Sequence, residues 1–235
     1  MKQYFLGIEF GSTRIKAVLL DEKHAIVKSG DYTWKSSLEN GVWTYHMEDV
    51  QKGLRTAIRN LGKLPGKISA MGVSGMMHGY LAFDKDWNLL APFRTWQNTM
   101  TGEAADKLTE AFGFNIPQRW SAAHLYQAVL NGEPHVKNIA HVTTLAGYVH
   151  YLLTGENVLG VGEASGMFPI DSETLTYDAA MLDKFDALMA KYGFDWNIRA
   201  VLPEVRTAGQ SAGLLTPSGS EYLGGLLPAG IPLCP

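Results

Sequence analysis

Residues 4–20 read YFLGIEFGSTRIKAVLL, in which two apolar runs, 4–10 and 14–20, are joined by the small residues at 11–13. Runs rich in Ile, Leu, Val and Phe on either side of a glycine-containing turn predict a β-hairpin. A third strand is expected at 25–33, after a short polar turn. The chain is therefore expected to begin with three consecutive strands.

The segments that follow this hairpin alternate between helix and strand patterns. Residues 49–61 place apolar side chains at helical spacing with basic side chains between them, which predicts a helix. A short strand of small residues is expected at 68–74, ending at Gly75. A polar turn inside residues 80–90 predicts a second hairpin.

From Gly102 onward the pattern becomes helical, and the last part, 209–235, holds many Gly and Pro with short apolar pieces between them. The expected helices are 102–112, 122–130, 143–153 and 178–192. Strands followed by a helix, another strand and then several helices predict a mixed α/β layer architecture.

The composition is that of an ordinary globular protein. The 235 residues are 46% hydrophobic and 18% charged, which is enough apolar material for one large domain or two small ones. The formal net charge of −3 offers no basic field for nucleic acid or an anionic membrane, and no run approaches the roughly 18 apolar residues that span a bilayer. A single cysteine, Cys234, and an N-terminus without a signal peptide's apolar core predict a cytoplasmic protein.

The turn at 11–13 has a chemical interpretation. Backbone N–H groups at a hairpin tip, with the hydroxyls of Ser12 and Thr13 beside them, can form a concavity for phosphate oxygens. Gly11 lets a ligand approach the backbone, Lys16 adds a positive charge, and Glu9 offers oxygen ligands to a divalent cation. The same residues also fit a plain tight turn with a solvated Glu9. Taken alone the hairpin is weak evidence, and the spacing of a Walker A loop is absent.

Three further stretches favour the phosphate-binding interpretation of this turn over a plain tight turn: GVSGMMHGYLAFD at 72–84, APFRTWQNTMTGEAADKL at 91–108 and GEASGMFPIDSETLTYD at 162–178. Together with GIEFGSTRIKAVLLDE at 7–22, their order and spacing resemble the N-terminal domain of the FGGY carbohydrate kinases, and within that family the xylulokinases. The resemblance covers essentially the whole chain. It implies a ribonuclease-H-like (actin-like ATPase) α/β domain, with a mixed sheet flanked by helices on both faces and an added helical, sugar-facing region.

The resemblance implies a role for each residue of the first hairpin. Glu9 stands where the family usually has an aspartate that handles Mg²⁺, so its extra methylene alters that geometry. Gly11, Ser12 and Thr13 match the hairpin that binds the phosphates of ATP, and Lys16 matches a basic position near the transferred phosphate.

The resemblance also implies a sugar site. Met77 and His78 match the sugar-contacting loop, Trp96 matches the aromatic wall, and Asn98 stands where a Trp-x-Asp motif places a carboxylate. Because an amide carries no charge, this departure leaves the identity of the sugar open. Each residue has a structural alternative: a loop histidine bonded to the backbone for His78, a core anchor for Trp96 and an Asx turn for Asn98.

Two parts of such a kinase are expected to lie beyond this chain. The family's general base is an aspartate in a Gly-Asp segment after a Gly-Ile-Pro strand, and residues 228–235 match that strand up to Pro235. We therefore expect residues 1–235 to be the N-terminal sugar-binding domain, with no catalytic base of its own. Its expected partners are the sugar and a missing C-terminal, adenosine-binding domain, and the domain alone is expected to be inactive. A homodimer of the parent protein stays open.

One function is favoured and two alternatives are kept. The parent protein is expected to be a kinase that uses ATP and Mg²⁺ to phosphorylate a hydroxyl of a ketose, with a pentulose such as xylulose as the first candidate. A non-catalytic sugar-binding or sensor module of the same fold is supported only by the departures at Glu9 and Asn98. A different ATPase of the actin/hexokinase superfamily is disfavoured by His78 and Trp96, because those families have no sugar pocket there.

Overall fold

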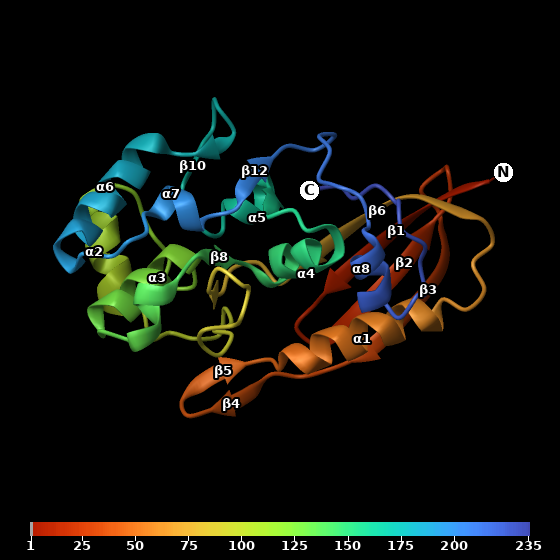
Figure 1. Ribbon diagram of the computed structural model, residues 1–235, viewed down its shortest axis with the longest axis horizontal. Helices are drawn as coiled ribbons and strands as arrows, with labels where there is room; N and C mark the ends of the chain where they lie inside the picture. Colours follow the sequence, from red (N-terminus) through yellow and green to blue (C-terminus); the bar gives the residue numbers. More distant parts are fainter. Residues whose placement is uncertain (1) are drawn as a thin grey trace.

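The computed structural model describes residues 2–235, and a four-stranded sheet forms one end of it (Figure 1). The strands are β1 (Gln3–Phe10), β2 (Arg14–Leu20), β3 (Ile26–Thr33) and β6 (Lys67–Gly75), in the order β3-β2-β1-β6. β1 pairs antiparallel with β2 and parallel with β6, and β2 pairs antiparallel with β3. The predicted first hairpin, third strand and mixed sheet are confirmed.

The last residues of the chain extend this sheet beyond β6. Leu233 forms a parallel bridge with Met71. The Met71 N–H donates to the Pro232 carbonyl, and the Cys234 N–H donates to the Met71 carbonyl, both at 2.9 Å. One of the apolar pieces noted near the end of the sequence therefore lies beside β6 as a fifth, short strand-like segment.

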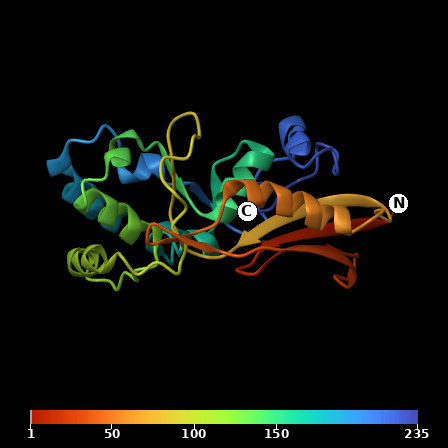
Figure 2. The same cartoon turned by 90° about the horizontal axis from the view of Figure 1, so that it is seen from below.

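The sheet is covered by helices on one face. Along β1, Leu6, Ile8 and Phe10 are buried while Glu9 is exposed, and β2 shows the same alternation, with Lys16 exposed. Figure 2 shows the helices α1 (Met47–Asn60), α4 (Leu145–Thr154) and α8 (Pro217–Tyr222) on the same side of the sheet, and their apolar side chains join one core with those of β1. Helices on both faces were predicted. Within residues 2–235 the prediction is not met for the second face, which is exposed or half-buried along β1 and β2 and mixes charged side chains with Phe5, Val18 and Leu20.

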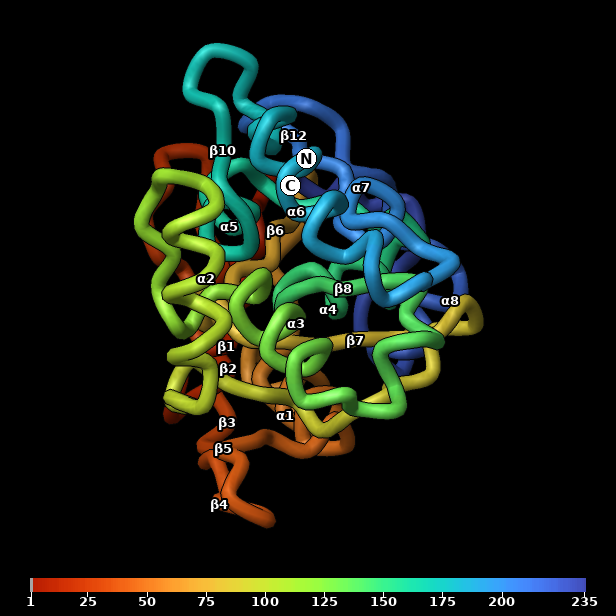
Figure 3. Tube along the Cα trace, turned by 90° about the vertical axis from the view of Figure 1, so that its left-hand side faces the viewer, coloured from red at the N-terminus to blue at the C-terminus, as the bar shows by residue number. Residues whose placement is uncertain are grey.

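The other end of the molecule is a helical region with its own core (Figure 3). Its helices are α2 (Gly102–Phe112), α3 (Ser121–Leu130), η1 (Pro134–Asn138), α5 (Val161–Ala164), α6 (Ala179–Met189), η2 (Ala190–Tyr192) and α7 (Ile198–Val201). Within the described part of the chain, no helix combines the length and the hydrophobicity that crossing a membrane requires.

Short strand pairs complete the fold. They are β4 (Ser37–Glu39) with β5 (Val42–Thr44), β7 (Leu81–Phe83) with β8 (His141–Thr143), β9 (Val158–Gly160) with β12 (Glu204–Arg206), and β10 (Ile170–Asp171) with β11 (Thr176–Tyr177). In Figure 3 the β4–β5 and β10–β11 hairpins project from opposite sides of the molecule. β7 also forms the predicted hairpin, through a bridge between Phe83 and Leu89, but its longer partner is β8.

The predicted helices agree with the structure to within a few residues. α2 has the predicted bounds, α1 and α3 begin one or two residues earlier, and the third predicted helix begins two residues later, at Leu145. The later start has a local cause, since the Thr144 side chain accepts the Gly147 N–H and caps α4. Asp178 caps α6 in the same way by accepting the Met181 N–H.

Candidate functional site

A pocket of about 290 Å³ lies between the β1–β2 turn and the loop that follows β6. It is lined by Ser12, Met76, Met77, His78, Trp96 and Arg119. Four of these residues, all except Met76 and Arg119, were predicted from the sequence. The structure therefore brings a residue of the predicted phosphate turn and residues of the predicted sugar loop to one cavity.

The turn at 11–13 is held from the core side by two aromatic side chains. The Trp34 indole N–H donates to the Gly11 carbonyl (2.7 Å) and the Tyr45 hydroxyl donates to the Ser12 carbonyl (2.6 Å). The Trp34 backbone N–H donates to the Thr13 carbonyl (3.1 Å). In residues 2–235 the N–H groups of Ser12 and Thr13 donate to no acceptor, and both residues are exposed. The Gly11 N–H donates to the Arg14 carbonyl (2.9 Å), so the two amides of this turn that are free to bind an anion are those of Ser12 and Thr13.

Glu9 and Lys16 face each other across this hairpin. They are paired in the register of β1 and β2, and the Lys16 Nζ lies 3.5 Å from a Glu9 carboxylate oxygen, with both side chains about half exposed. An ion pair this exposed is weak, so either side chain can turn to a ligand. Residues 2–235 contain no group of three or more His, Cys, Asp or Glu that could hold a metal. Mg²⁺ is often held by one or two carboxylates together with phosphate oxygens, so a single Glu9 fits this mode, and its role stays a prediction.

The loop after β6 has an unusual backbone. His78 has φ +72° and Gly79 has φ +97°. Left-handed backbone is uncommon for a residue other than glycine, and such strain gathers at ligand sites. At Gly79 an added Cβ would lie 2.8 Å from the Arg94 carbonyl oxygen, so glycine is required there. This conformation places the His78 ring at the pocket.

The hydrogen bond of His78 sets which of its nitrogens is free. Nδ1 lies 3.1 Å from the Gly166 carbonyl oxygen, and because a carbonyl only accepts, Nδ1 carries the proton. Burial lowers the pKa of His78, the Gly166 hydrogen bond opposes this, and the charge of Arg119 adds to it. The ring is therefore neutral at neutral pH and its Nε2 can accept a hydrogen bond from a hydroxyl. Gly166 permits this contact, since a Cβ there would lie 2.7 Å from Nδ1.

Trp96 and Met77 give the pocket an apolar wall. Trp96 is 45% exposed and Met77 is 39% exposed, although both side chains are large and apolar. Exposed apolar surface beside a cavity is a mark of a ligand site, and an indole face suits the C–H groups of a sugar. Trp96 is therefore not a core anchor.

Asn98 does not line the pocket. It is only 4% exposed, and its side-chain oxygen accepts the Trp43 N–H at 2.8 Å. Its amide nitrogen donates to the carbonyls of Trp43 (2.9 Å) and Thr95 (3.0 Å). These bonds tie β5 to the turn at 95–98, so Asn98 has a structural role, although not the Asx turn that was the expected alternative.

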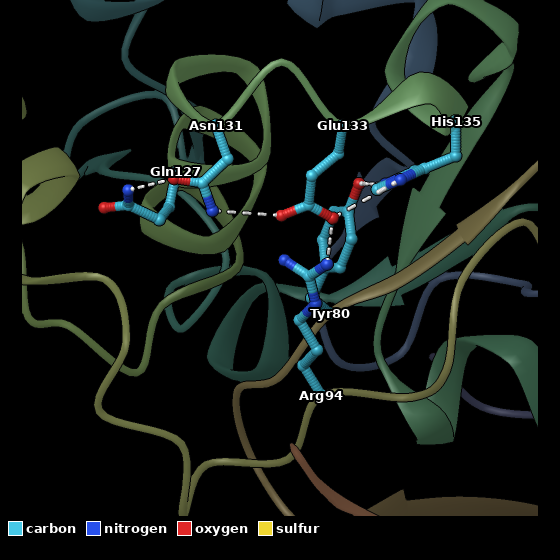
Figure 4. A network of polar contacts seen from close by, with 6 residues as sticks. All are labelled: Tyr80, Arg94, Gln127, Asn131, Glu133 and His135. Carbon is cyan, nitrogen blue, oxygen red and sulfur yellow. Dashed lines mark hydrogen bonds and ion pairs between the residues drawn. The ribbon is translucent and has the colours of Figure 1, made fainter. Parts of the chain in front are cut away.

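A partly buried polar network lies beside the segments that carry the pocket walls (Figure 4). Tyr80 and Arg94 exchange backbone hydrogen bonds at 2.8 and 3.1 Å, and the Arg94 guanidinium lies 5.3 Å from the centre of the Tyr80 ring. Tyr80 lies two residues after His78, and Arg94 lies two residues before Trp96. Their pairing therefore fixes the distance between the two segments that carry these pocket residues.

The same network continues to the segment before η1. Arg94 forms an ion pair and hydrogen bond with Glu133, and the Tyr80 hydroxyl lies 2.8 Å from His135 Nε2. Asn131 donates to the other Glu133 oxygen at 3.2 Å. Burial alone would raise the pKa of Glu133, but the hydrogen bond and the charge of Arg94 outweigh it and lower the pKa. Glu133 therefore stays ionised beside Arg94.

Sequence reasoning missed Arg119 and Gly166, whereas Met76 stands in the loop at 76–79 that matches the family's sugar loop. An exposed arginine just before a helix has no local pattern that separates it from ordinary surface. Gly166 lies 88 residues from His78 along the chain, so no spacing rule connects them. The stretch that contains Gly166, at 162–178, was noted only for its likeness to a family segment.

A search for related sequences identifies the family. Residues 4–234 match the family model described as "FGGY family of carbohydrate kinases, N-terminal domain". The chain is 25% identical to the glycerol kinase of Thermococcus gammatolerans over 245 residues, which cover 97% of this chain and 47% of that protein. It is 22% identical to the xylulose kinase of Lactococcus lactis subsp. lactis over 199 residues, which cover 78% of this chain and 39% of that protein.

The fold has known counterparts as well. The structure of a gluconate kinase from Lactobacillus acidophilus superposes with a TM-score of 0.82 at 19% sequence identity, covering 99% of this chain and 47% of that one. At this identity the likeness establishes the fold. The actin-like ATPase fold class that the sequence predicted is thus confirmed. The chain spans about half the length, or less, of the curated relatives it matches.

Proposed function

The chain belongs to the FGGY family of carbohydrate kinases, and on this basis we propose that it is the sugar-binding part of a kinase that transfers the γ-phosphate of ATP to a hydroxyl of a small polyhydroxylated acceptor. The named relatives are a glycerol kinase, a xylulose kinase and a gluconate kinase, so the acceptor differs within the family. A pentulose such as xylulose is the candidate that the loop at 76–79 favours.

The observation that carries this proposal is the shared pocket. Ser12, whose backbone amide is free, lines the same cavity as His78 and Trp96. Phosphoryl transfer depends mostly on positioning the two reactants and on stabilising charge on the phosphoryl oxygens. An acceptor site that adjoins a phosphate site is the arrangement this chemistry needs.

Each residue then has a task on the phosphate side. The amides of Ser12 and Thr13 donate to phosphate oxygens of ATP, and Lys16 adds a positive charge beside them. Glu9 would hold Mg²⁺ through an oxygen or a bound water, and the ion would neutralise charge on the phosphates. These assignments rest on the free amides of the turn and on the half-exposed Glu9–Lys16 pair.

On the acceptor side the tasks differ. Trp96 packs against C–H groups, Met77 adds apolar contact, and His78 Nε2 accepts a hydroxyl proton in a hydrogen bond. We propose that the general base and the adenosine site come from a second domain of the parent protein, in line with the share of its relatives that the chain covers. A homodimer and a cytoplasmic location stay predictions.

The non-catalytic alternative loses one of its two supports. Asn98 is buried against Trp43, so its amide says little about the sugar site. The change at Glu9 remains, and it leaves a carboxylate in place on a side chain one methylene longer than aspartate.

The test is to titrate the chain with xylulose, ribulose, glycerol and gluconate, following the indole resonance of Trp96 and the ring resonances of His78. This chain provides one side of the proposed binding cleft, without a second domain to close over the ligand, so we expect weak binding with a Kd on the order of millimolar. Trp96→Ala and His78→Ala should each weaken binding about 10-fold, because a polar or stacking contact is lost. Trp87→Phe, outside the pocket, serves as the matched control. Spectra in which none of these compounds moves Trp96 or His78 would refute the pocket assignment.

A further inference from the structure

Arg119 is fixed at the rim of the pocket by its backbone. The Gly79 N–H donates to the Arg119 carbonyl (3.3 Å), and the Ser121 hydroxyl donates to the Gly79 carbonyl (2.5 Å). Both the N–H and the carbonyl of Gly79 are therefore bonded to the segment 119–121, which holds this segment against the loop that carries His78. The guanidinium is close enough to His78 for its charge to contribute to the lowered pKa of that ring.

The Arg119 side chain has no protein partner. In the described residues 2–235 its guanidinium makes no ion pair and no hydrogen bond. Four other arginines, Arg14, Arg94, Arg199 and Arg206, each pair with a carboxylate, and Arg55 donates to the carbonyls of Glu221 and Tyr222. Within the same described residues Arg59 on α1 is unpaired as well, but it does not line the pocket. An unpaired cation at a ligand pocket is available to the ligand.

The pocket also holds no acidic side chain. Its lining consists of Ser12, three apolar side chains, the neutral His78 and Arg119, so its only full charge is positive. A neutral sugar offers only hydroxyls to this charge. A carboxylate would meet the planar guanidinium with two parallel hydrogen bonds, the geometry for which arginine is best suited.

We propose that the pocket selects a sugar acid, an acceptor that carries a carboxylate as well as hydroxyls, and that Arg119 binds the carboxylate. This inference rests on the proposed function and deepens it, since it favours an acidic acceptor over the neutral pentulose. Trp96 contacts the carbon chain, His78 Nε2 accepts from one hydroxyl, and the hydroxyl that is phosphorylated is the one that reaches Ser12.

The experiment uses pairs of compounds that share one hydroxyl pattern and differ in the carboxylate. D-gluconate is compared with D-glucitol, and D-xylonate with xylitol, by calorimetry and by the Trp96 indole shift at low salt. We expect each acid to bind at least about 10-fold more tightly than its polyol, and the preference to shrink as ionic strength rises. Arg119→Gln should abolish the preference and Arg119→Lys should reduce it. Arg14→Gln, an exposed arginine outside the pocket, should leave it unchanged.

Three results would overturn the inference in distinguishable ways. Equal binding of acid and polyol rejects the sugar acid but keeps the carbohydrate pocket. A preference for the acid that survives in Arg119→Gln keeps the sugar acid but rejects Arg119 as the group that binds its carboxylate. If neither acid nor polyol moves Trp96, the proposed function of the pocket falls together with the inference.

Discussion

The sheet region and the helical region of this molecule are built on different kinds of core. Within the described residues 2–93, Thr44 is the only buried polar or charged residue, and the core of β1, β2 and α1 is apolar. The helical region buries Arg94, His124 and Gln127, while the polar groups buried on the sheet side from Arg94 onward include His150 and Thr154 of α4. Apolar burial is strong but non-directional, whereas hydrogen bonds and ion pairs fix angles. The sheet core therefore supplies stability, and the polar network sets where the pocket walls lie.

The largest effect is expected from breaking the polar network. Arg94→Met leaves the carboxylate of Glu133 partly buried without its cation, which costs about 3–5 kcal/mol of unfolding free energy. Urea denaturation measures the loss, and sugar binding should weaken in the folded fraction because the pocket walls shift. Arg14→Met breaks an exposed pair and should cost less than about 1 kcal/mol. Equal costs for the two variants would contradict this view of the network.

A cavity in the sheet core should cost nearly as much and leave the pocket unchanged. Leu54 on α1 is fully buried, so Leu54→Ala removes packing and costs about 3 kcal/mol. Urea denaturation gives the cost, and the Kd for the best ligand, measured below the unfolding transition, should match the wild type. A large change in that Kd would show that the sheet core also positions the site.

The pH dependence of stability should reveal a buried group of the helical region. His124 is buried in α3 with no partner for either ring nitrogen in residues 2–235, and burial lowers the pKa of His124 to about 3. The folded state binds this proton less readily than the unfolded state. The stability from neutral His124 is therefore present above pH 6.5 and is lost toward pH 3, by up to about 1.4 kcal/mol per pH unit.

The measurement is the difference in unfolding free energy between the wild type and His124→Phe from pH 7 to pH 4. A difference is needed because burial raises the pKa of Glu163 to about 7, which makes the folded state less stable as pH rises from 4.5 to 7. A difference that stays constant with pH would mean that His124 is solvated or partnered.

The smallest effect is expected at the exposed pair on the open face of the sheet. Lys16→Met should change stability by less than about 1 kcal/mol, because the pair with Glu9 is half exposed. Binding of ATP phosphates, followed through the amide shifts of Ser12 and Thr13, should weaken all the same. A thermal melt with a large drop in Tm would place Lys16 among the structural residues.

The sequence predicted the sheet region well because its signals are local. Alternation along β1 and β2 and the helical spacing of α1 are visible within short windows. α2 was predicted residue for residue, and it ends at Gly113, whose φ of +65° is the left-handed cap expected of glycine. The three-residue strands β9 and β12 give no periodic signal and were missed, whereas β7, equally short, was found from the polar turn that follows it.

The pocket was predictable only where a residue type carried its own chemistry. His78 and Trp96 were found by type and motif, but burial decides between a ligand and a structural role, and burial is a property of the fold. Asn98 shows this, since its motif position suggested a sugar contact while its buried side-chain oxygen and nitrogen both bond to neighbouring backbone groups. Arg119 shows the converse, because only the fold carries it to His78.

The fifth segment beside β6 has a consequence for synthesis in the cell. Met71 hydrogen-bonds with Cys234, 163 residues further along the chain. At a translation rate of 5–20 residues per second, roughly 8–30 s pass between the two residues. During that time the outer edge of β6 lacks this neighbour, and an open strand edge is a template for aggregation. The nascent chain should therefore depend on a chaperone during this interval, and pairings of such long range also make refolding slow.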